Sequence, residues 1–403
     1  MAIIFHVDVN NAFLSWSAIY LLQNGASIDI RTIPSIIGGD EKSRKGIVLA
    51  KSQVAKKYGI QTAEPIYTAR KKCHNLQVFP PNYAWYKAQS KKLVNYLAQY
   101  TPTIEQYSID ECFLDMTGTT LLYGNNYTKL ARKMADEIYQ KFGFTVNVGI
   151  GENKLCAKMA SDFEKPNKVH TLYQNEIKSK MWPLPVEELF MLGKSSAKKL
   201  KSLGIYTIGQ LAQANIAVLT KHFKNQVIYF KQASMGIDNS KVIPKTEQNK
   251  CISISRTLPY DITTKESLEK ILLKETEDIA FTLRQKKLYA KTIAITYKNN
   301  IFKSYSHQLS LDNAICTTDE IYQQVILILK NSWKEDPIRN IGIRLSDLSA
   351  NPNQQLSLFT AEEEKQDEEI EKLMDQLITK FGKNSIMRAS HKEHHQNDVI
   401  ERK

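Results

Sequence analysis

Cysteine is scarce in this sequence, and long apolar runs are missing. The 403 residues include five cysteines, which are scattered, odd in number and never spaced as Cys-x-x-Cys. We therefore expect neither a disulfide framework nor a zinc site, and a reducing, cytoplasmic compartment fits best. No run of 18 apolar residues occurs, so no membrane span is expected. The first residues also lack the basic, apolar and small-residue pattern of a secretory signal.

Acidic residues are in the minority, so the chain carries an excess of positive charge. Its formal net charge is +13. Residues 360–403 hold 8 Lys or Arg and 11 Asp or Glu, which leaves a net charge of +16 on residues 1–359. Such a body suits a polyanionic partner, although charge alone identifies none. A chain of 403 residues is too long for one ordinary core, which predicts roughly two to four domains.

The first part of the chain predicts a small mixed sheet. Apolar runs and period-two alternation predict strands, and near-helical spacing of apolar residues predicts helices. The strands fall at residues 3–9, 103–107, 112–116 and 144–150, and the helices at 85–100 and 127–142. The order strand, helix, strand, strand, helix, strand is that of a ferredoxin-like fold, into which residues 11–75 are inserted.

A later part of the chain repeats the same order of elements. Residues 251–348 carry long helical patterns at 265–287 and 318–335, and a hairpin turns at Asn299-Asn300. Between the two parts, residues 184–211 predict short helices joined by tight turns that contain glycine. The predicted fold class is therefore α+β with several domains.

Three carboxylates that are far apart in the sequence are expected to meet. In the ferredoxin-like order, the first two strands run parallel and the third lies antiparallel between them. The end of the first strand, at Asp8, then lies on the same edge as the turn at Asp110-Glu111. Phosphoryl transfer needs divalent cations held by hard oxygen ligands, roughly 4 Å apart. The carboxylates fit such a metal site, and the alternative is that they are ordinary turn residues.

Three stretches contain these carboxylates or follow them: HVDVNNAF at 6–13, YSIDECFLD at 107–115 and AKMASDFEKPN at 157–167. They resemble the Y-family DNA polymerases, above all the bacterial polymerase IV branch, and the likeness runs through about residues 2–350. The resemblance implies that Asp8 and Asp110 ligate both metals and that Val9 offers its carbonyl. It implies that Glu111 helps to bind the metal that activates the primer 3′ hydroxyl. The expected cofactors are two Mg²⁺ ions, with Mn²⁺ as a substitute.

The resemblance also divides the chain into domains. The implied fold is a ferredoxin-like palm with inserted fingers, a helical helix-hairpin-helix thumb and a second βαββαβ domain, the little finger. The boundaries are palm 1–10 and 76–165, fingers 11–75, thumb 166–236, linker 237–244, little finger 245–350 and a flexible tail 351–403.

Four residues are expected to bind the incoming nucleotide. By the resemblance, Phe13 is the steric gate, whose ring leaves no room for a 2′-OH and so selects deoxynucleotides. Lys165 matches the family's phosphate-binding lysine. Gln53 and Lys56 occupy positions where the family often has tyrosine and arginine, and a solvated helix face remains the alternative for both. For Phe13 the alternative is an ordinary core residue.

Two regions are expected to hold DNA without reading its sequence. Residues 185–207 resemble a helix-hairpin-helix, in which Gly193 and Ser195 lie at a turn that aims backbone N–H groups at a phosphate. Ser195 replaces the usual second glycine. In the little finger, Arg256, Arg339 and Arg344 lie on or beside predicted strands that suit a duplex backbone. A plain helical hairpin and a solvated sheet face are the alternatives.

The tail contains a short apolar peptide after the last predicted domain. Gln355, Leu356, Leu358 and Phe359 resemble the family's sliding-clamp peptide, in which Gln, Leu and Phe enter an apolar groove. Clamp tethering raises local concentration and so processivity. A helical stretch follows at 370–381, with Ile370, Leu373 and Leu377 on one face.

The expected function is a low-fidelity, template-directed DNA polymerase that bypasses lesions and has no proofreading exonuclease. Primer-template DNA and deoxynucleoside triphosphates are the expected substrates, and the protein is expected to be a monomer. Two other classes remain open. A non-catalytic DNA-binding scaffold predicts the loss of a metal carboxylate, and all three are present. A metal-dependent nuclease would use the same ions but needs neither a sugar gate nor a clamp peptide.

Overall fold

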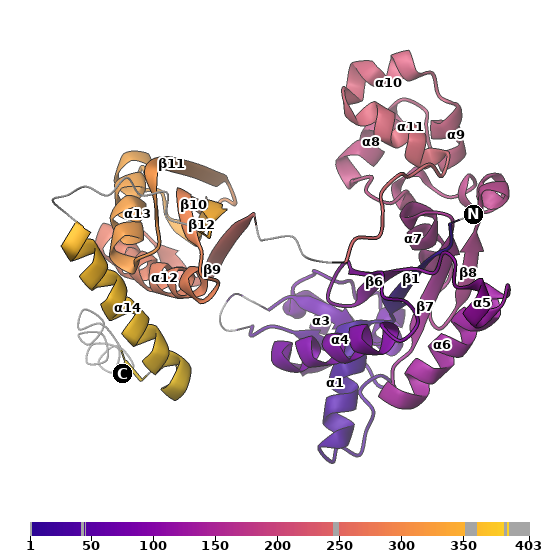
Figure 1. Ribbon diagram of the computed structural model, residues 1–403, viewed down its shortest axis with the longest axis horizontal. Coiled ribbons are helices and arrows are strands. Elements are labelled where there is room, and N and C mark those ends of the chain that lie inside the picture. The colour runs from indigo at the N-terminus through magenta and orange to yellow at the C-terminus, as the bar shows by residue number, and fades with distance from the viewer. Residues whose placement is uncertain are drawn as a thin grey trace. The chain divides into compact units, whose positions relative to one another are not determined.

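The computed structural model describes residues 2–41, 44, 46–244, 250–350, 361–382 and 385–386. The chain forms two compact units (Figure 1). The first comprises Met1–Glu41 and Gly46–Thr246, and the second comprises Lys42–Lys45 and Glu247–Lys403. Within the described ranges, no helix combines the length and the apolar character needed to cross a membrane.

A five-stranded sheet in the order β5-β6-β1-β7-β8 is the centre of the first unit. Its strands are β1 (Ile4–Val9), β5 (Ile104–Gln106), β6 (Glu111–Asp115), β7 (Val146–Gly151) and β8 (Val169–Leu172). Since β6 pairs antiparallel with both β1 and β5, these two strands run parallel to each other. The predicted ferredoxin-like arrangement of β1, β5, β6 and β7 is confirmed. β8, which pairs parallel with β7, is an addition that the sequence did not predict.

Helices cover both faces of this sheet, and two further groups of elements join it. The helices of the first unit are α1 (Ala12–Gln23), α2 (Gln53–Lys57), α3 (Ile66–Lys72), α4 (Tyr83–Leu97), α5 (Thr120–Tyr123), α6 (Tyr127–Phe142), α7 (Lys154–Asp162), α8 (Lys194–Ser202), α9 (Ile208–Gln213), α10 (Ile216–Phe223) and α11 (Gln226–Ser234). Short turns of other helix types lie at Gln174–Glu176, Ile177–Met181 and Val186–Glu188.

Alternation along β1 decides which side chains each face of the sheet carries. Phe5, Val7 and Val9 point into the core that α4 and α6 complete. The even-numbered residues point to the opposite face, which α7 covers, and there His6 Nδ1 lies 2.8 Å from Ser161 Oγ. Asp8 belongs to this second set, so its carboxylate faces α7.

The inserted segment builds a sheet of its own together with β4 (Gln77–Phe79), the strand that follows residue 75. β2 (Ser35–Gly38) lies between β3 (Val48–Lys51) and β4. α2 and α3 pack with these strands around a separate small core that includes Ile36 and Ile66. The helices α8 to α11 share a further core with α7.

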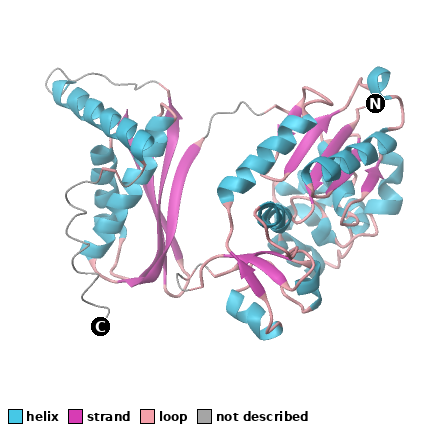
Figure 2. Cartoon of the chain, turned by 90° about the horizontal axis from the view of Figure 1, so that it is seen from below, coloured by secondary structure: helices cyan, strands magenta, loops and turns pink. Residues whose placement is uncertain are grey.

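The second unit is a four-stranded antiparallel sheet with helices on one face (Figure 2). Its elements are β9 (Cys251–Ile262), α12 (Lys265–Gln285), β10 (Tyr289–Asn299), β11 (Ser304–Ile315), α13 (Thr318–Ser332) and β12 (Ile338–Ser349). The element order matches the prediction, but the strand order β11-β10-β12-β9 is not that of the first unit. Here the second and fourth strands are central, whereas β1 and β6 are the inner pair of the ferredoxin-like set.

The hairpin of the second unit turns later than predicted. β10 continues through Asn299, and the chain reverses over residues 300–303 before β11 begins. The Asn299 side chain explains the longer loop, because its Oδ1 accepts the Lys303 N–H at 2.9 Å. Phe302 lies in the loop with φ 63°, and its N–H donates to Asn299 O at 3.0 Å.

A final helix, α14 (Ala361–Phe381), packs against the second unit through its acidic side. Arg284 of α12 donates from Nε and Nη2 to the two carboxylate oxygens of Asp375, at 2.8 and 3.0 Å. Glu371 accepts the Thr318 N–H at the start of α13, at 3.0 Å. Ile370 and Leu373, on the apolar face that the sequence pattern indicates, are more than half exposed.

Helix α7 approaches the sheet closely at Gly149 of β7. A Cβ at this position would collide with the backbone of Ala157 and Ser161 in α7. Gly149→Ala should therefore push α7 off the sheet and lower the free energy of unfolding by about 1–3 kcal/mol. Urea denaturation measures this. Gly193→Ala, where a Cβ meets nothing within 4 Å, is the matched control; equal stabilities would contradict the close approach.

Candidate active site

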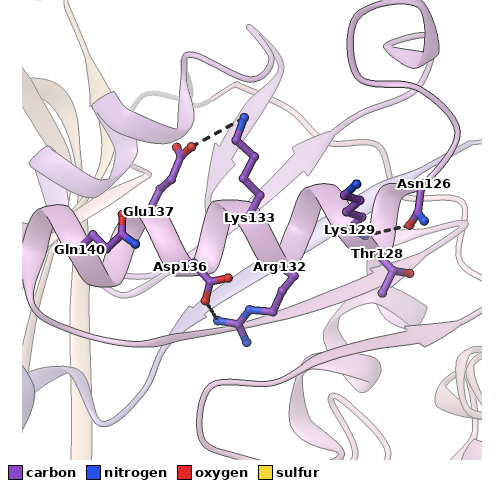
Figure 3. Close-up of a pocket in the computed structure, with 8 residues that line it drawn as sticks. All are labelled: Asn126, Thr128, Lys129, Arg132, Lys133, Asp136, Glu137 and Gln140. Atoms are coloured by element: carbon purple, nitrogen blue, oxygen red, sulfur yellow. Dashed lines mark hydrogen bonds and ion pairs between the residues drawn. The ribbon is translucent and has the colours of Figure 1, made fainter.

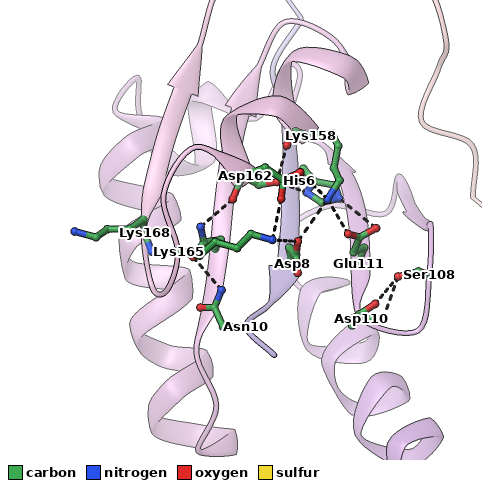
Figure 4. Close-up of polar contacts among 12 residues, drawn as sticks. His6, Asp8, Asn10, Ser108, Asp110, Glu111, Lys158, Asp162, Lys165 and Lys168 are labelled. Carbon is green, nitrogen blue, oxygen red and sulfur yellow. Dashed lines mark hydrogen bonds and ion pairs between the residues drawn. The ribbon is translucent and has the colours of Figure 1, made fainter. Parts of the chain in front are cut away.

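The sheet register brings the first and third predicted acids together. Asp8 on β1 lies directly opposite Glu111 on β6, and both side chains point to the face that α7 covers. Asp110 precedes β6 in the turn, where its carbonyl accepts the Val9 N–H at 3.1 Å. Figure 4 shows the three residues at one end of the paired strands.

Two lysines lie among these carboxylates. Lys158 of α7 places Nζ 2.7 Å from Glu111 Oε1 and 3.5 Å from Asp8 Oδ2. Lys165, in the loop after α7, places Nζ 2.6 Å from Asp8 Oδ2. Asp162 binds both lysines, at 3.1 Å from Lys158 and 2.8 Å from Lys165. The site is therefore an alternating network of acids and ammonium groups.

Burial and neighbouring charge shift the protonation of this network. Burial raises the pKa of the Glu111 carboxyl, although the hydrogen bond from Lys158 opposes the rise. Burial lowers the pKa of Lys158, but attraction to Asp8 and the hydrogen bond to Glu111 exceed that effect and raise it overall. The ammonium form of Lys158 is thus secure at neutral pH. Burial lowers the pKa of His6 well below its ordinary value, so its ring is uncharged at neutral pH.

The donor types fit a hard divalent cation, but the side chains are arranged around ammonium groups. Carboxylates and a backbone carbonyl such as that of Val9 are the oxygen ligands that Mg²⁺ prefers. Among the described residues, however, no group of three or more His, Cys, Asp or Glu lies close enough to hold one ion. Asp110 faces Ser108, whose Oγ donates to its Oδ1 at 2.6 Å. For Asp8 and Asp110 to ligate the same ion, the Asp110 side chain has to rotate toward Asp8. The ammonium groups of Lys158 and Lys165 also have to move away from the Asp8 carboxylate.

Asparagine side chains fix the loop that carries Lys165. Asn10, one residue beyond β1, accepts the Asn167 N–H at 2.8 Å and donates to Asn147 Oδ1 at 3.0 Å. Asn147 of β7 donates to the carbonyls of Ser161 and Glu164, at 2.8 and 2.6 Å. The backbone on either side of Lys165 is therefore held to the sheet, and its side chain is the part free to move.

Phe13 lies in the first turn of α1, a few residues beyond Asp8. Its ring stacks on Tyr86 of α4, with centroids 4.8 Å apart and an angle of 13° between planes. The Tyr86 hydroxyl is 2.6 Å from Ser17 Oγ, which fixes the supporting ring. Phe13 itself is half-buried, so the structure gives it both a core contact and an accessible surface.

Gln53 and Lys56 are exposed on the short helix α2. Ser52 caps this helix, because its Oγ accepts the Ala55 N–H at 2.9 Å. Burial, together with repulsion from Lys56 and Lys72, lowers the pKa of Lys51 at the end of β3. Crowded cations of this kind suit an anionic ligand, and Lys51 is one that the sequence did not single out.

The expected DNA contacts have different surroundings. Gly193 precedes α8 as its cap and brings no capping side chain, and Ser195 lies exposed in the first turn. Arg344 lies on the open face of the second sheet, opposite Ala294. Arg256 is in register with the core residue Ile341, and it pairs with the buried Glu275 of α12 at 2.5 Å.

Arg339 stacks over the exposed Phe302 ring, 4.9 Å from its centroid. The expected clamp residues Gln355, Leu356, Leu358 and Phe359 lie outside the described residues. Arg256, Arg339 and Arg344 belong to the second unit, and the three carboxylates belong to the first.

The open face of the second sheet is rich in short polar side chains. In register across the four strands lie Ser255, Gly342, Thr296 and Ser306, and the next row of this face is Ser253, Arg344, Ala294 and Gln308. The opposite face carries the isoleucines and leucines that pack against α12 and α13. This polar face offers hydroxyl, amide and guanidinium groups.

Lys158 and Asp162 are functional candidates that sequence reasoning missed. Both lie inside the stretch at 157–167, and Lys158 sits among small and apolar residues. That setting was the available signal, since a lysine on a buried helix face needs carboxylate partners. A separate hollow lies along the outer face of α6, lined by residues that include Lys129 and Arg132 (Figure 3). None of the three carboxylates lines it.

The chain is similar to known families over most of its length. Residues 7–162 match the impB/mucB/samB family, and residues 249–358 match the C-terminal domain of that family. Residues 174–205 match the IMS family HHH motif. These three segments contain the carboxylate site, the second sheet and the turn around Gly193.

Relatives named DNA polymerase IV match nearly the whole chain. The protein from Clostridium acetobutylicum is 46% identical, over 96% of this chain and 97% of the relative. The protein from Clostridium kluyveri is 34% identical, over 96% of this chain and 98% of the relative. The protein from Bacillus subtilis, named DNA polymerase IV 1, is 31% identical, over 96% of this chain and 92% of the relative. A solved Y-family DNA polymerase chimera superposes with a TM-score of 0.75 at 24% identity, covering 87% of this chain and 100% of that one. The structural likeness confirms the predicted fold class.

Removing Lys158 should leave the carboxylates without their most buried counter-charge. Without divalent ions, Lys158→Met is expected to lower the free energy of unfolding by about 3 kcal/mol in a urea titration, since an unpaired buried charge is costly. The double variant with Lys158→Met and Glu111→Gln should recover part of the lost free energy of unfolding. Lys168→Met, which removes a half-exposed pair with Glu164, is the control and should change stability by less than about 1 kcal/mol. If Lys158→Met has the same free energy of unfolding as the wild type, the charge network does not stabilise the fold.

Proposed function

The chain belongs to the impB/mucB/samB family of Y-family DNA polymerases, and we propose on that basis that it is a template-directed DNA polymerase. It would add deoxynucleotides to a primer 3′ end and tolerate damaged templates. The observation that carries the proposal is the convergence of Asp8, Asp110 and Glu111 at one end of β1 and β6. Such an acidic end is the place where a nucleotidyl transferase holds its ions.

The proposed chemistry uses two divalent ions, Mg²⁺ or Mn²⁺. Bound ions would activate the primer hydroxyl and stabilise the leaving phosphate. Asp8, Asp110 and the Val9 carbonyl would ligate both ions. Glu111 would be a further ligand of the ion beside the primer hydroxyl. The residues of the chain align the nucleotide and supply the negative charge that draws the ions in.

The nucleotide would lie between the carboxylates and the inserted segment. Lys165 would bind its phosphates, with Gln53 and Lys56 of α2 as further contacts. Phe13, supported from behind by Tyr86, would lie under the sugar and exclude a 2′-OH.

Both units would hold DNA through its backbone. The uncapped start of α8 at Gly193 and Ser195 directs N–H groups outward, which suits a phosphate. On the open face of the second sheet, Arg344 and the surrounding hydroxyls suit a duplex backbone. Arg339 remains a candidate contact, whereas the pairing of Arg256 with Glu275 leaves it less available. In this proposal the palm is 1–10 and 76–165, the fingers 11–75, the thumb 166–236 and the little finger 245–350.

Further properties follow from the same proposal. The peptide Gln355–Phe359 would bind a sliding clamp, and the protein would work as a cytoplasmic monomer on genomic DNA. Low fidelity is expected because no segment of this sequence resembles a proofreading exonuclease.

Primer extension tests the function directly. With Mg²⁺, dNTPs and a primed template, the wild type should lengthen the primer. Asp110→Asn and Glu111→Gln should each slow extension by on the order of a thousandfold, because ion-held transition-state charge is lost. Asp136→Asn on the outer face of α6 is the control and should extend normally. Shortening of the primer would instead identify a nuclease, and DNA binding without turnover would identify a scaffold.

Sugar selection tests the role of Phe13. Phe13→Val should raise ribonucleotide insertion relative to deoxynucleotide insertion by on the order of tenfold or more, since the space under the sugar opens. Single-nucleotide insertion with matched dNTP and rNTP measures the ratio. Phe13→Tyr keeps a ring of the same width and should keep the discrimination. An unchanged ratio in Phe13→Val would assign Phe13 to the core alone.

A further inference from the structure

Lys165 lies where a divalent ion would need to bind. Its Nζ is 2.6 Å from Asp8 Oδ2, so the ammonium group forms an ion pair with one of the carboxylate oxygens that are proposed as metal ligands. A second carboxylate, Asp162 Oδ1, lies 2.8 Å away and completes the contact (Figure 4). An ammonium group and a divalent ion at the same oxygen would repel each other, so the contact with Lys165 opposes ion binding at Asp8.

The two lysines of the network are not equally held. The Lys158 side chain is 10% exposed and contacts three carboxylates, whereas the Lys165 side chain is 39% exposed and contacts two. The backbone around Lys165 is fixed through Asn10 and Asn167, so only its flexible side chain has to move to release Asp8. Lys165 is therefore the ammonium group that a ligand can most easily displace.

We propose that Lys165 is a positioning residue that closes the ion site in the nucleotide-free protein and opens it when a nucleotide binds. The inference rests on the proposed polymerase function. The triphosphate offers Lys165 a stronger partner than Asp8, so the ammonium group moves to the phosphates and leaves Asp8 Oδ2 to the ion. Each ligand thus removes a contact that opposes the other, and the two bind with positive coupling.

Binding of Mn²⁺ to the full-length protein, without DNA or nucleotide, tests the closure. Free Mn²⁺ is followed by electron paramagnetic resonance during titration. Lys165→Met should bind Mn²⁺ on the order of tenfold more tightly than the wild type, because the competing ammonium group is gone. Lys165→Arg restores a cation and should return the affinity to the wild-type value. Lys168→Met removes a nearby charge that pairs with Glu164 instead, and should leave the affinity unchanged.

Two further measurements decide between competition at Asp8 and other effects. In an Asp8→Asn background, Lys165→Met should no longer tighten Mn²⁺ binding, because the contested oxygen has changed. Binding of dTTP in EDTA should weaken on the order of tenfold in Lys165→Met and persist in Lys165→Arg. Weaker dTTP binding with unchanged Mn²⁺ affinity would overturn the competition, and so would equal tightening in Lys168→Met.

The outcome is separable from that of the polymerase proposal. If the carboxylate variants abolish primer extension while Lys165→Met binds Mn²⁺ like the wild type, the function stands and the closure by Lys165 is wrong. If the wild type neither extends a primer nor binds Mn²⁺ through Asp8, the function itself fails.

Discussion

Negative charge gathered at one buried end of a sheet is the constraint on which this structure depends. Asp8 faces Glu111 across paired strands with Asp110 beside them, and like charges so close are unstable unless cations lie among them. The chain itself supplies Lys158 and Lys165. The proposed chemistry needs the same negative charge, with metal ions in exchange for ammonium groups. Stability and function therefore draw on one charge balance.

Local periodicity was enough to predict much of this arrangement. The period of two along β1 separates the core residues from Asp8, and the order of strands and helices determines that the turn at Asp110 lies beside it. The fold class and the main helices and strands were predicted correctly for the same reason, because each rests on patterns within a few turns of chain. The roles of Phe13 and Lys165 came from resemblance, and they remain proposals here.

What the sequence could not show depends on pairings between distant elements. The strand order of the second unit follows from how β10 and β12 pair, which no local pattern encodes. Arg256 was expected to face DNA, but it lies in register with the core residue Ile341 and pairs with Glu275 of α12. α14 likewise docks through acids, because Arg284 pairs with Asp375, and Ile370 and Leu373 of its apolar side stay exposed.

The short hydroxyl side chains on the open face of the second sheet have a consequence for movement. The hydroxyl hydrogens of serine and threonine rotate to suit an acceptor, so these groups can bind a phosphate oxygen that approaches from several directions. A duplex held on this face, as proposed, would meet similar hydroxyl partners after each one-nucleotide step. Deep, shape-matched pockets would hold one register and resist translocation. In the proposed complex, a polar surface of this kind would let the double helix slide while it stays attached.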